Sequence, residues 1–174
     1  MVDALYPFVR FLARSAALLG GIALIALVVM TVVSIIGRNF TAFGPVPGDF
    51  ELVEAGVAFA IFAFMPWCQL NRGHAAVEIL ASRFGVLFNN LIDLISDVLL
   101  LGLWIFLGYR HFLGMLDKKG YSETTFILQY PIWWAYAAAL AGIVVIVIVS
   151  IFCVLRSIRN LTSRRLPEPS GAIH

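Results

Sequence analysis

Two histidines and a pair of aspartates are the side chains of this sequence with the clearest capacity for chemistry. His74 and His111 could bind a b-type haem, whose iron is held by axial histidines. Both ligands of one haem must lie at the same depth in a membrane, whereas we expect His74 near one membrane surface and His111 near the other. We therefore interpret both histidines as polar residues at the membrane interfaces, and we expect no cofactor.

The aspartates Asp93 and Asp97 are four residues apart, so they share one face of a helix. A carboxylate within a membrane span is a candidate for function by default. Both aspartates lie near the expected start of their helix, where the helix dipole favours anions. We expect them to contact a partner or the first-turn amides of the helix rather than to relay protons.

Signatures of enzymes are missing from the sequence. It has no glycine-rich phosphate loop, no nucleophile elbow and no HExxH zinc motif. Its two cysteines, Cys68 and Cys153, are 85 residues apart and give neither a metal-binding spacing nor a disulfide framework. The formal net charge is only +2, and the basic residues gather at helix ends. We predict a protein that is not an enzyme and that binds neither a metal nor a nucleic acid.

The composition indicates a membrane protein. Of the 174 residues, 61% are hydrophobic and 13% are charged, whereas soluble domains are near half apolar and a quarter charged. Crossing the hydrocarbon core of a bilayer takes about 20 residues of helix. We predict an all-α integral membrane protein of one domain, with four transmembrane helices at residues 15–37, 52–70, 91–111 and 131–155.

The segments outside the four spans have patterns of their own. Residues 75–89 carry apolar side chains at helical spacing with Glu78 and Arg83 between them. That pattern predicts an interfacial amphipathic helix between the second and third spans. We also expect a polar loop at residues 113–129 and a disordered tail at residues 163–174.

The basic residues predict the orientation of the chain. The N-terminus, the segment between the second and third spans and the C-terminal tail carry eight of them: Arg10, Arg14, Arg72, Arg83, Arg156, Arg159, Arg164 and Arg165. The opposite side carries four: Arg38, Arg110, Lys118 and Lys119. Because cytoplasmic segments are enriched in Lys and Arg, we expect both termini in the cytoplasm.

Two kinds of contact are expected at the helix surfaces. Arg38 closes the first span and should pair with Glu51 or Glu54 at the start of the second, since the two spans form an antiparallel pair. Stripes of small residues four apart, which include Gly21 in the first span and Gly142 in the fourth, let helix backbones approach closely. These stripes could serve internal packing or a partner equally well.

Four local sequences stand out along the chain: GRNF at residues 37–40, DFELVE at 49–54, RGHAAVE at 72–78 and ILQYPIWWAY at 127–136. Their order and spacing resemble the small membrane subunit of tripartite ATP-independent periplasmic (TRAP) transporters, the DctQ-like family. The resemblance covers about residues 15–155. The chain departs from the family pattern at Gly48, where the family often has Trp, and at Glu78, where it usually has Asp.

The resemblance implies a complex of three parts in a bacterial inner membrane. A periplasmic substrate-binding protein captures an organic acid, for example a C4-dicarboxylate or sialic acid. A large membrane subunit transports the acid with a sodium gradient by an elevator motion, and the small subunit enlarges its fixed scaffold in the lipid. The helix at residues 75–89 resembles the family's arm helix, so Arg72, His74 and Glu78 join the candidate contact or structural residues.

Two other functions are compatible with the residues alone. The chain could be the membrane anchor subunit of a respiratory oxidoreductase, which a haem absorption spectrum would detect. A self-contained small exporter is disfavoured, because the first span contains no carboxylate for coupling.

We predict that reporter fusions after residues 45, 80, 120 and 174 read outside, inside, outside and inside, because of the imbalance of basic residues. Paired alkaline phosphatase and green fluorescent protein fusions measure the side of each position. A periplasmic signal at residue 80 or 174 would contradict this topology.

Overall fold

The structure, a computed structural model of the chain, describes residues 2–39, 44–71 and 86–163. Four long helices make up most of this part: α1 (Val2–Asn39), α2 (Asp49–Leu70), α4 (Val86–Gly120) and α5 (Trp133–Ser163). Each contains an apolar stretch long enough to cross a membrane. The predicted fold class, an all-α membrane protein with four spans, is therefore confirmed for the described residues.

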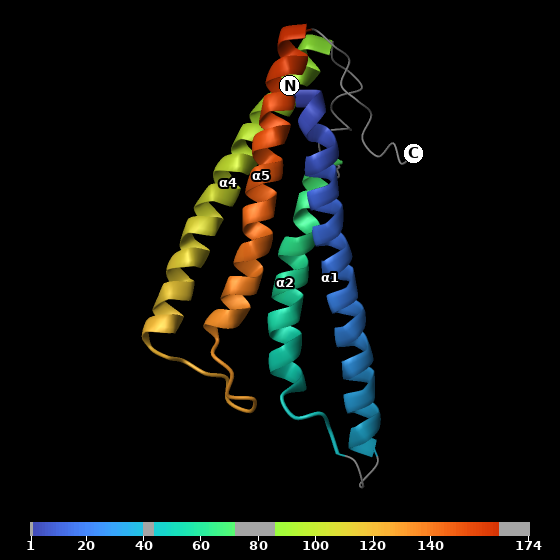
Figure 1. Cartoon of the computed structure of the whole chain (residues 1–174), viewed down its shortest axis with the longest axis vertical. Coiled ribbons are helices and arrows are strands. Elements are labelled where there is room, and N and C mark those ends of the chain that lie inside the picture. The colour runs from blue at the N-terminus through green and yellow to red at the C-terminus, as the bar shows by residue number, and fades with distance from the viewer. Residues whose placement is uncertain (1, 40–43, 72–85, 164–174) are drawn as a thin grey trace.

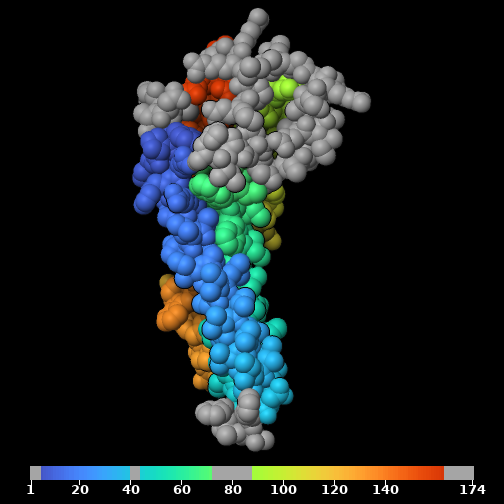
Figure 2. Space-filling model, turned by 90° about the vertical axis from the view of Figure 1, so that its right-hand side faces the viewer, coloured from blue at the N-terminus to red at the C-terminus, as the bar shows by residue number. Residues whose placement is uncertain are grey.

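The helices lie side by side in a row, in the order α1, α2, α5, α4 (Figure 1). We call the end where α1 starts and α5 ends the narrow end, since all four helices converge there. Toward the opposite, wide end the α4–α5 pair diverges from the α1–α2 pair (Figure 1). Seen from the α1 edge, the described body is long and slender (Figure 2). Helices α2 and α5 thus lie inside the row, and α1 and α4 form its edges.

A small apolar core holds the narrow end together. Val9 and Ala13 of α1 are buried, and they pack with Val149 and Phe152 of α5 and with Leu70 of α2. This contact explains why α1 begins far before residue 15, the predicted start of the first span. The arginines of this segment do not prevent it, because they lie on the exposed side of the helix.

Glycines let neighbouring helices approach closely in the middle of the row. A Cβ atom added at Gly142 of α5 would lie 2.9 Å from the backbone of Phe62 on α2. A Cβ atom added at Gly20 of α1 would lie 3.0 Å from the Cβ atom of Ala63, which also belongs to α2. Helix α2 is therefore in near backbone contact with both neighbours. Gly21, in contrast, has no described atom within 4 Å of such a position, so it faces open space.

The first part of α4 overlaps the predicted interfacial helix. Residues 86–89 of that prediction belong to α4, and the rest of the predicted helix lies outside the described residues. Asn90 is buried here, and its side-chain amide donates a hydrogen bond of 3.3 Å to the backbone oxygen of Asn160 on α5. This bond explains why the start of α4 stays beside the end of α5.

The last part of α4 corrects the predicted loop at residues 113–129. The helix continues to Gly120, so the loop begins only there. The backbone N–H groups of Tyr121 and Glu123 donate hydrogen bonds to the carbonyls of Asp117 and Lys118, which satisfies the helix end. The charges in this turn suggested a loop, but charged side chains at a membrane border can reach water from a helix.

We predict that Gly142→Leu destabilises the protein and that Gly21→Leu, the same exchange on an open face, does not. A leucine at position 142 would collide with the backbone of Phe62 and push α2 away from α5, an overpacking that costs about 1–3 kcal/mol. Thermal unfolding of the purified chain in detergent measures the difference. Equal melting temperatures for the two variants would contradict this packing.

Candidate functional site

The connection from α4 to α5 forms a small hairpin at the wide end. Thr124 and Pro131 make an isolated antiparallel bridge, and the Thr125 N–H donates a hydrogen bond of 3.1 Å to the Tyr130 carbonyl. The backbone of Gln129 has a φ of 52°, in the left-handed region that tight turns use. We call residues 123–132 the rim hairpin. It carries the chain from α4 past the start of α2 and back to α5 (Figure 1).

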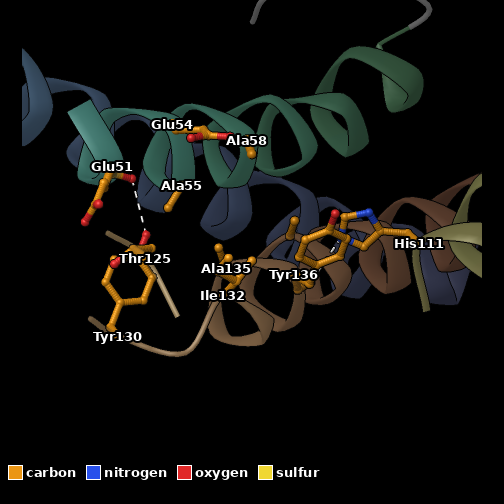
Figure 3. Close-up of a pocket in the computed structure, with 11 residues that line it drawn as sticks. Glu51, Glu54, Ala55, Ala58, His111, Thr125, Tyr130, Ile132, Ala135 and Tyr136 are labelled. Atoms are coloured by element: carbon orange, nitrogen blue, oxygen red, sulfur yellow. Dashed lines mark hydrogen bonds between the residues drawn. The ribbon is translucent and has the colours of Figure 1, made fainter. Parts of the chain in front are cut away.

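Glu51, in the first turn of α2, binds the rim hairpin. Its carboxylate accepts hydrogen bonds from the N–H groups of Ile127 at 2.7 Å and Leu128 at 3.0 Å. The Tyr130 hydroxyl donates a further bond of 3.2 Å to the backbone carbonyl of Glu51 (Figure 3). Gly48 allows this approach, since a Cβ atom there would overlap the side chain of Leu128. One acidic side chain thus attaches the α4–α5 connection to α2 through charge-assisted hydrogen bonds.

The structure corrects the predicted partner of Arg38. Its guanidinium forms an ion pair of 2.9 Å with Asp49 and not with Glu51 or Glu54. The Ser34 hydroxyl donates a hydrogen bond of 2.5 Å to the same carboxylate. Successive residues of a helix are rotated by about 100°, so Glu51, two residues after Asp49, points to the opposite side of α2. The acidic residues at the start of α2 therefore bind two different neighbours.

A cavity of about 290 Å³ lies at the wide end between α2, α5 and the rim hairpin (Figure 3). His111 of α4 reaches it, with Nε2 3.1 Å from the backbone oxygen of Tyr136 and the two rings stacked 4.8 Å apart. Glu54 lines the cavity and makes no hydrogen bond or ion pair within the described part of the chain. Burial, with the carboxylates of Glu51 and Glu54, raises the pKa of Tyr130, so its hydroxyl stays protonated at neutral pH.

A second set of polar contacts joins three helices near the narrow end. Asp97 of α4 is buried and accepts a hydrogen bond of 2.5 Å from the Ser157 hydroxyl of α5. The side-chain amide of Gln69 on α2 donates a longer bond of 3.4 Å to Asp97. Asp93, one turn earlier, is half-buried. The structure therefore places Asp97 inside the chain, where neighbouring helices satisfy its carboxylate.

The remaining candidate residues are not gathered into one site. Arg72, His74 and Glu78 lie outside the described residues, so of the two histidines expected at the membrane interfaces only His111 is described. Gly142 packs against α2, as described above. Among the residues that the structure describes, no group of three or more His, Cys, Asp or Glu side chains could hold a metal ion.

Several residues that join the helices were not singled out from the sequence as contact residues, among them Ser34, Gln69, Asn90 and Ser157. Serines are frequent in membrane helices and often bond to their own backbone, so the residue type alone does not mark a contact. Gln69 is the exception, because an amide at the end of an otherwise apolar span needs a partner. That signal was present, but it could not identify Asp97 as the partner.

The fold and its polar contacts at both ends define a multi-pass membrane protein. A family model described as "Tripartite ATP-independent periplasmic transporters, DctQ component" matches residues 27–160, which is most of the chain. The chain belongs to this DctQ family, as the four local sequences indicated, and it is therefore the small-subunit type of transporter component. Comparisons with curated proteins and with solved structures gave no match.

We predict that Glu51→Ala exposes the rim hairpin to solvent exchange. The variant removes the acceptor of the Ile127 and Leu128 N–H groups, so these amides should exchange severalfold faster. Hydrogen–deuterium exchange of the purified chain, read on peptides that cover residues 121–130, measures the effect. Glu54→Ala is the matched control, because Glu54 makes no hydrogen bond to the hairpin; equal exchange in the two variants would contradict the role of Glu51.

Proposed function

We propose that this chain is the scaffold subunit of a sodium-driven, binding-protein-dependent transporter for an organic acid. In this proposal it packs against the large elevator-type subunit and braces it in a bacterial inner membrane. The sodium coupling and the substrate class rest on its membership of the DctQ family. The bracing role has support from the shape of the molecule itself.

The observation that carries the proposal is the unequal burial along the row. In the most apolar window of each helix, 44% of residues are buried for α5 and 17% for α2, but only 11% for α1 and for α4. Both edges therefore expose large apolar side chains, among them Ile22, Ile25, Val29, Leu99 and Phe106. A row of helices with two apolar edges presents a wide surface for a membrane partner on one side and for lipid on the other.

The membrane middle of the described helices offers no polar site for a solute. No charged residue occurs at residues 15–37 of α1, 55–70 of α2 or 133–155 of α5. Asp97 is buried and already accepts hydrogen bonds from Ser157 and Gln69. Pro66 lies near the end of α2, which continues as a helix to Leu70. Transporters bind solutes at polar sites of broken helices near the midplane of the membrane. We therefore assign binding of the solute within the membrane to the large partner subunit.

The proposed orientation places both termini in the cytoplasm. The start of α1 and the end of α5 lie at the same, narrow end of the molecule (Figure 1). In the sequence, the N-terminal part, the segment between α2 and α4 and the C-terminal part carry eight of the twelve basic residues, which favours the cytoplasmic side for both termini. The rim hairpin and the Arg38–Asp49 ion pair would then lie on the periplasmic side.

We predict that the chain transports nothing alone and is required in the complex. Reconstituted by itself in liposomes with a sodium gradient, it should show no uptake of radiolabelled organic acid, since the described spans lack a polar midplane site. Reconstituted with the large subunit and the binding protein, it should be necessary for uptake.

Liposomes that contain the two partners without this chain are the control. Uptake by the chain alone, or full uptake by the partners without it, would each contradict the scaffold function.

A further inference from the structure

The cavity at the wide end has no part in the proposed scaffold function. It lies between two membrane-spanning helices, α2 and α5, and the rim hairpin borders it (Figure 3). Its volume of about 290 Å³ equals roughly ten water molecules at liquid density. A space of this size between membrane helices needs an occupant that matches its walls.

The walls of the cavity combine polar side chains with two small apolar faces. The polar lining residues are Glu51, Glu54, His111, Thr125, Tyr130 and Tyr136. Ala55 and Ala58 line it from α2, and Ala135 and Ala139 line it from α5. Each pair is three or four residues apart, so it forms one continuous helix face. An unbranched hydrocarbon chain fits between two such faces.

The border of the cavity is anionic. Glu54 has no hydrogen bond or ion pair within the described residues, and the carboxylate of Glu51 accepts hydrogen bonds from the rim hairpin rather than from a cation. Two cations at this end of the molecule are engaged elsewhere, since Arg38 pairs with Asp49 and Lys118 with Glu123. The cavity thus has two carboxylates at its border, and none of its described lining residues is a lysine or an arginine.

The border also lies at the level where lipid headgroups sit. Glu54 belongs to the second turn of α2, and Trp133 begins α5. Tyr130, Trp133 and Trp134 gather at this end, and such aromatic residues mark the membrane–water interface. A phospholipid with an ammonium headgroup matches this arrangement. Its cationic group would lie at the border of the cavity, and its hydrocarbon chain would lie below it.

We propose that this cavity binds phosphatidylethanolamine from the leaflet at the wide end. One acyl chain lies between the alanine faces of α2 and α5, and the primary ammonium donates a hydrogen bond to the Glu54 carboxylate. An anionic lipid such as phosphatidylglycerol is excluded, because its headgroup would bring a third negative charge beside Glu51 and Glu54. Phosphatidylcholine has the positive charge but no N–H donor, so it binds more weakly.

Native mass spectrometry of the full-length chain tests the proposal. The chain is exchanged into detergent with equal amounts of phosphatidylethanolamine, phosphatidylcholine and phosphatidylglycerol, and the retained adducts are measured. Phosphatidylethanolamine should be retained best and phosphatidylglycerol least. Glu54→Gln should weaken retention of phosphatidylethanolamine by roughly tenfold, the effect of one charge-assisted hydrogen bond.

Two alanines of α5 provide a matched pair for the hydrocarbon site. Ala135→Leu fills the cavity and should abolish retention, whereas Ala138→Leu places the same side chain on the exposed face and should leave it unchanged. Equal retention of the ethanolamine and glycerol lipids, or unchanged retention in both Glu54→Gln and Ala135→Leu, would overturn the proposal.

The same measurement on the chain co-purified with its membrane partner tests a different occupant. Retention of the phosphatidylethanolamine adduct in the assembled complex supports the lipid. Loss of the adduct on assembly would assign the cavity to a side chain of the partner and would overturn the lipid proposal. Neither result depends on transport activity, so failure here is distinct from failure of the scaffold function.

Discussion

The hydrocarbon region of a bilayer contains no water, so each polar group within it must find its partner inside the protein. Asp97 shows what this constraint requires, because its buried carboxylate takes hydrogen bonds from two other helices, through Ser157 and Gln69. At the wide end, Asp49 forms an ion pair with Arg38, and Glu51 accepts hydrogen bonds from backbone N–H groups. The polar contacts are therefore collected at the two ends, and the middle of each span is left to apolar packing.

This division explains why the row opens toward the wide end. At the narrow end α2, α4 and α5 meet directly through side chains around Asp97, so they cannot separate there. In the middle, Gly142 and Gly20 keep both neighbours of α2 at near backbone contact. At the wide end the rim hairpin joins α2 to the start of α5, and Glu51 binds the hairpin, not α5 itself. The cavity is the space that this indirect connection leaves between the two helices.

Much of this architecture could be predicted from the sequence, and the failures have a common cause. The four spans are predictable because length and hydropathy decide them one segment at a time. The partner of Arg38 is not, because three acidic residues lie within two turns and only the rotation of α2 decides which faces α1. Gly21 and Gly142 look equivalent in sequence, yet Gly21 faces open space and Gly142 packs against α2. Each failure concerns how one helix is rotated relative to another. The sequence pattern of a single segment holds no information on this rotation.

Lipid tails are as apolar as leucine, so the exposed apolar edges of α1 and α4 do not by themselves draw a protein partner out of the lipid. Association between membrane helices needs closer packing or polar contacts than lipid can give. The two edges differ in this respect. Both helices leave a glycine open, Gly21 on α1 and Gly102 on α4. The residues four away from Gly102, Val98 and Phe106, are bulky and exposed, whereas Gly21 has the small residue Ala17 four residues before it. For the proposed scaffold function, a partner helix can therefore approach the backbone of α1 more closely than that of α4.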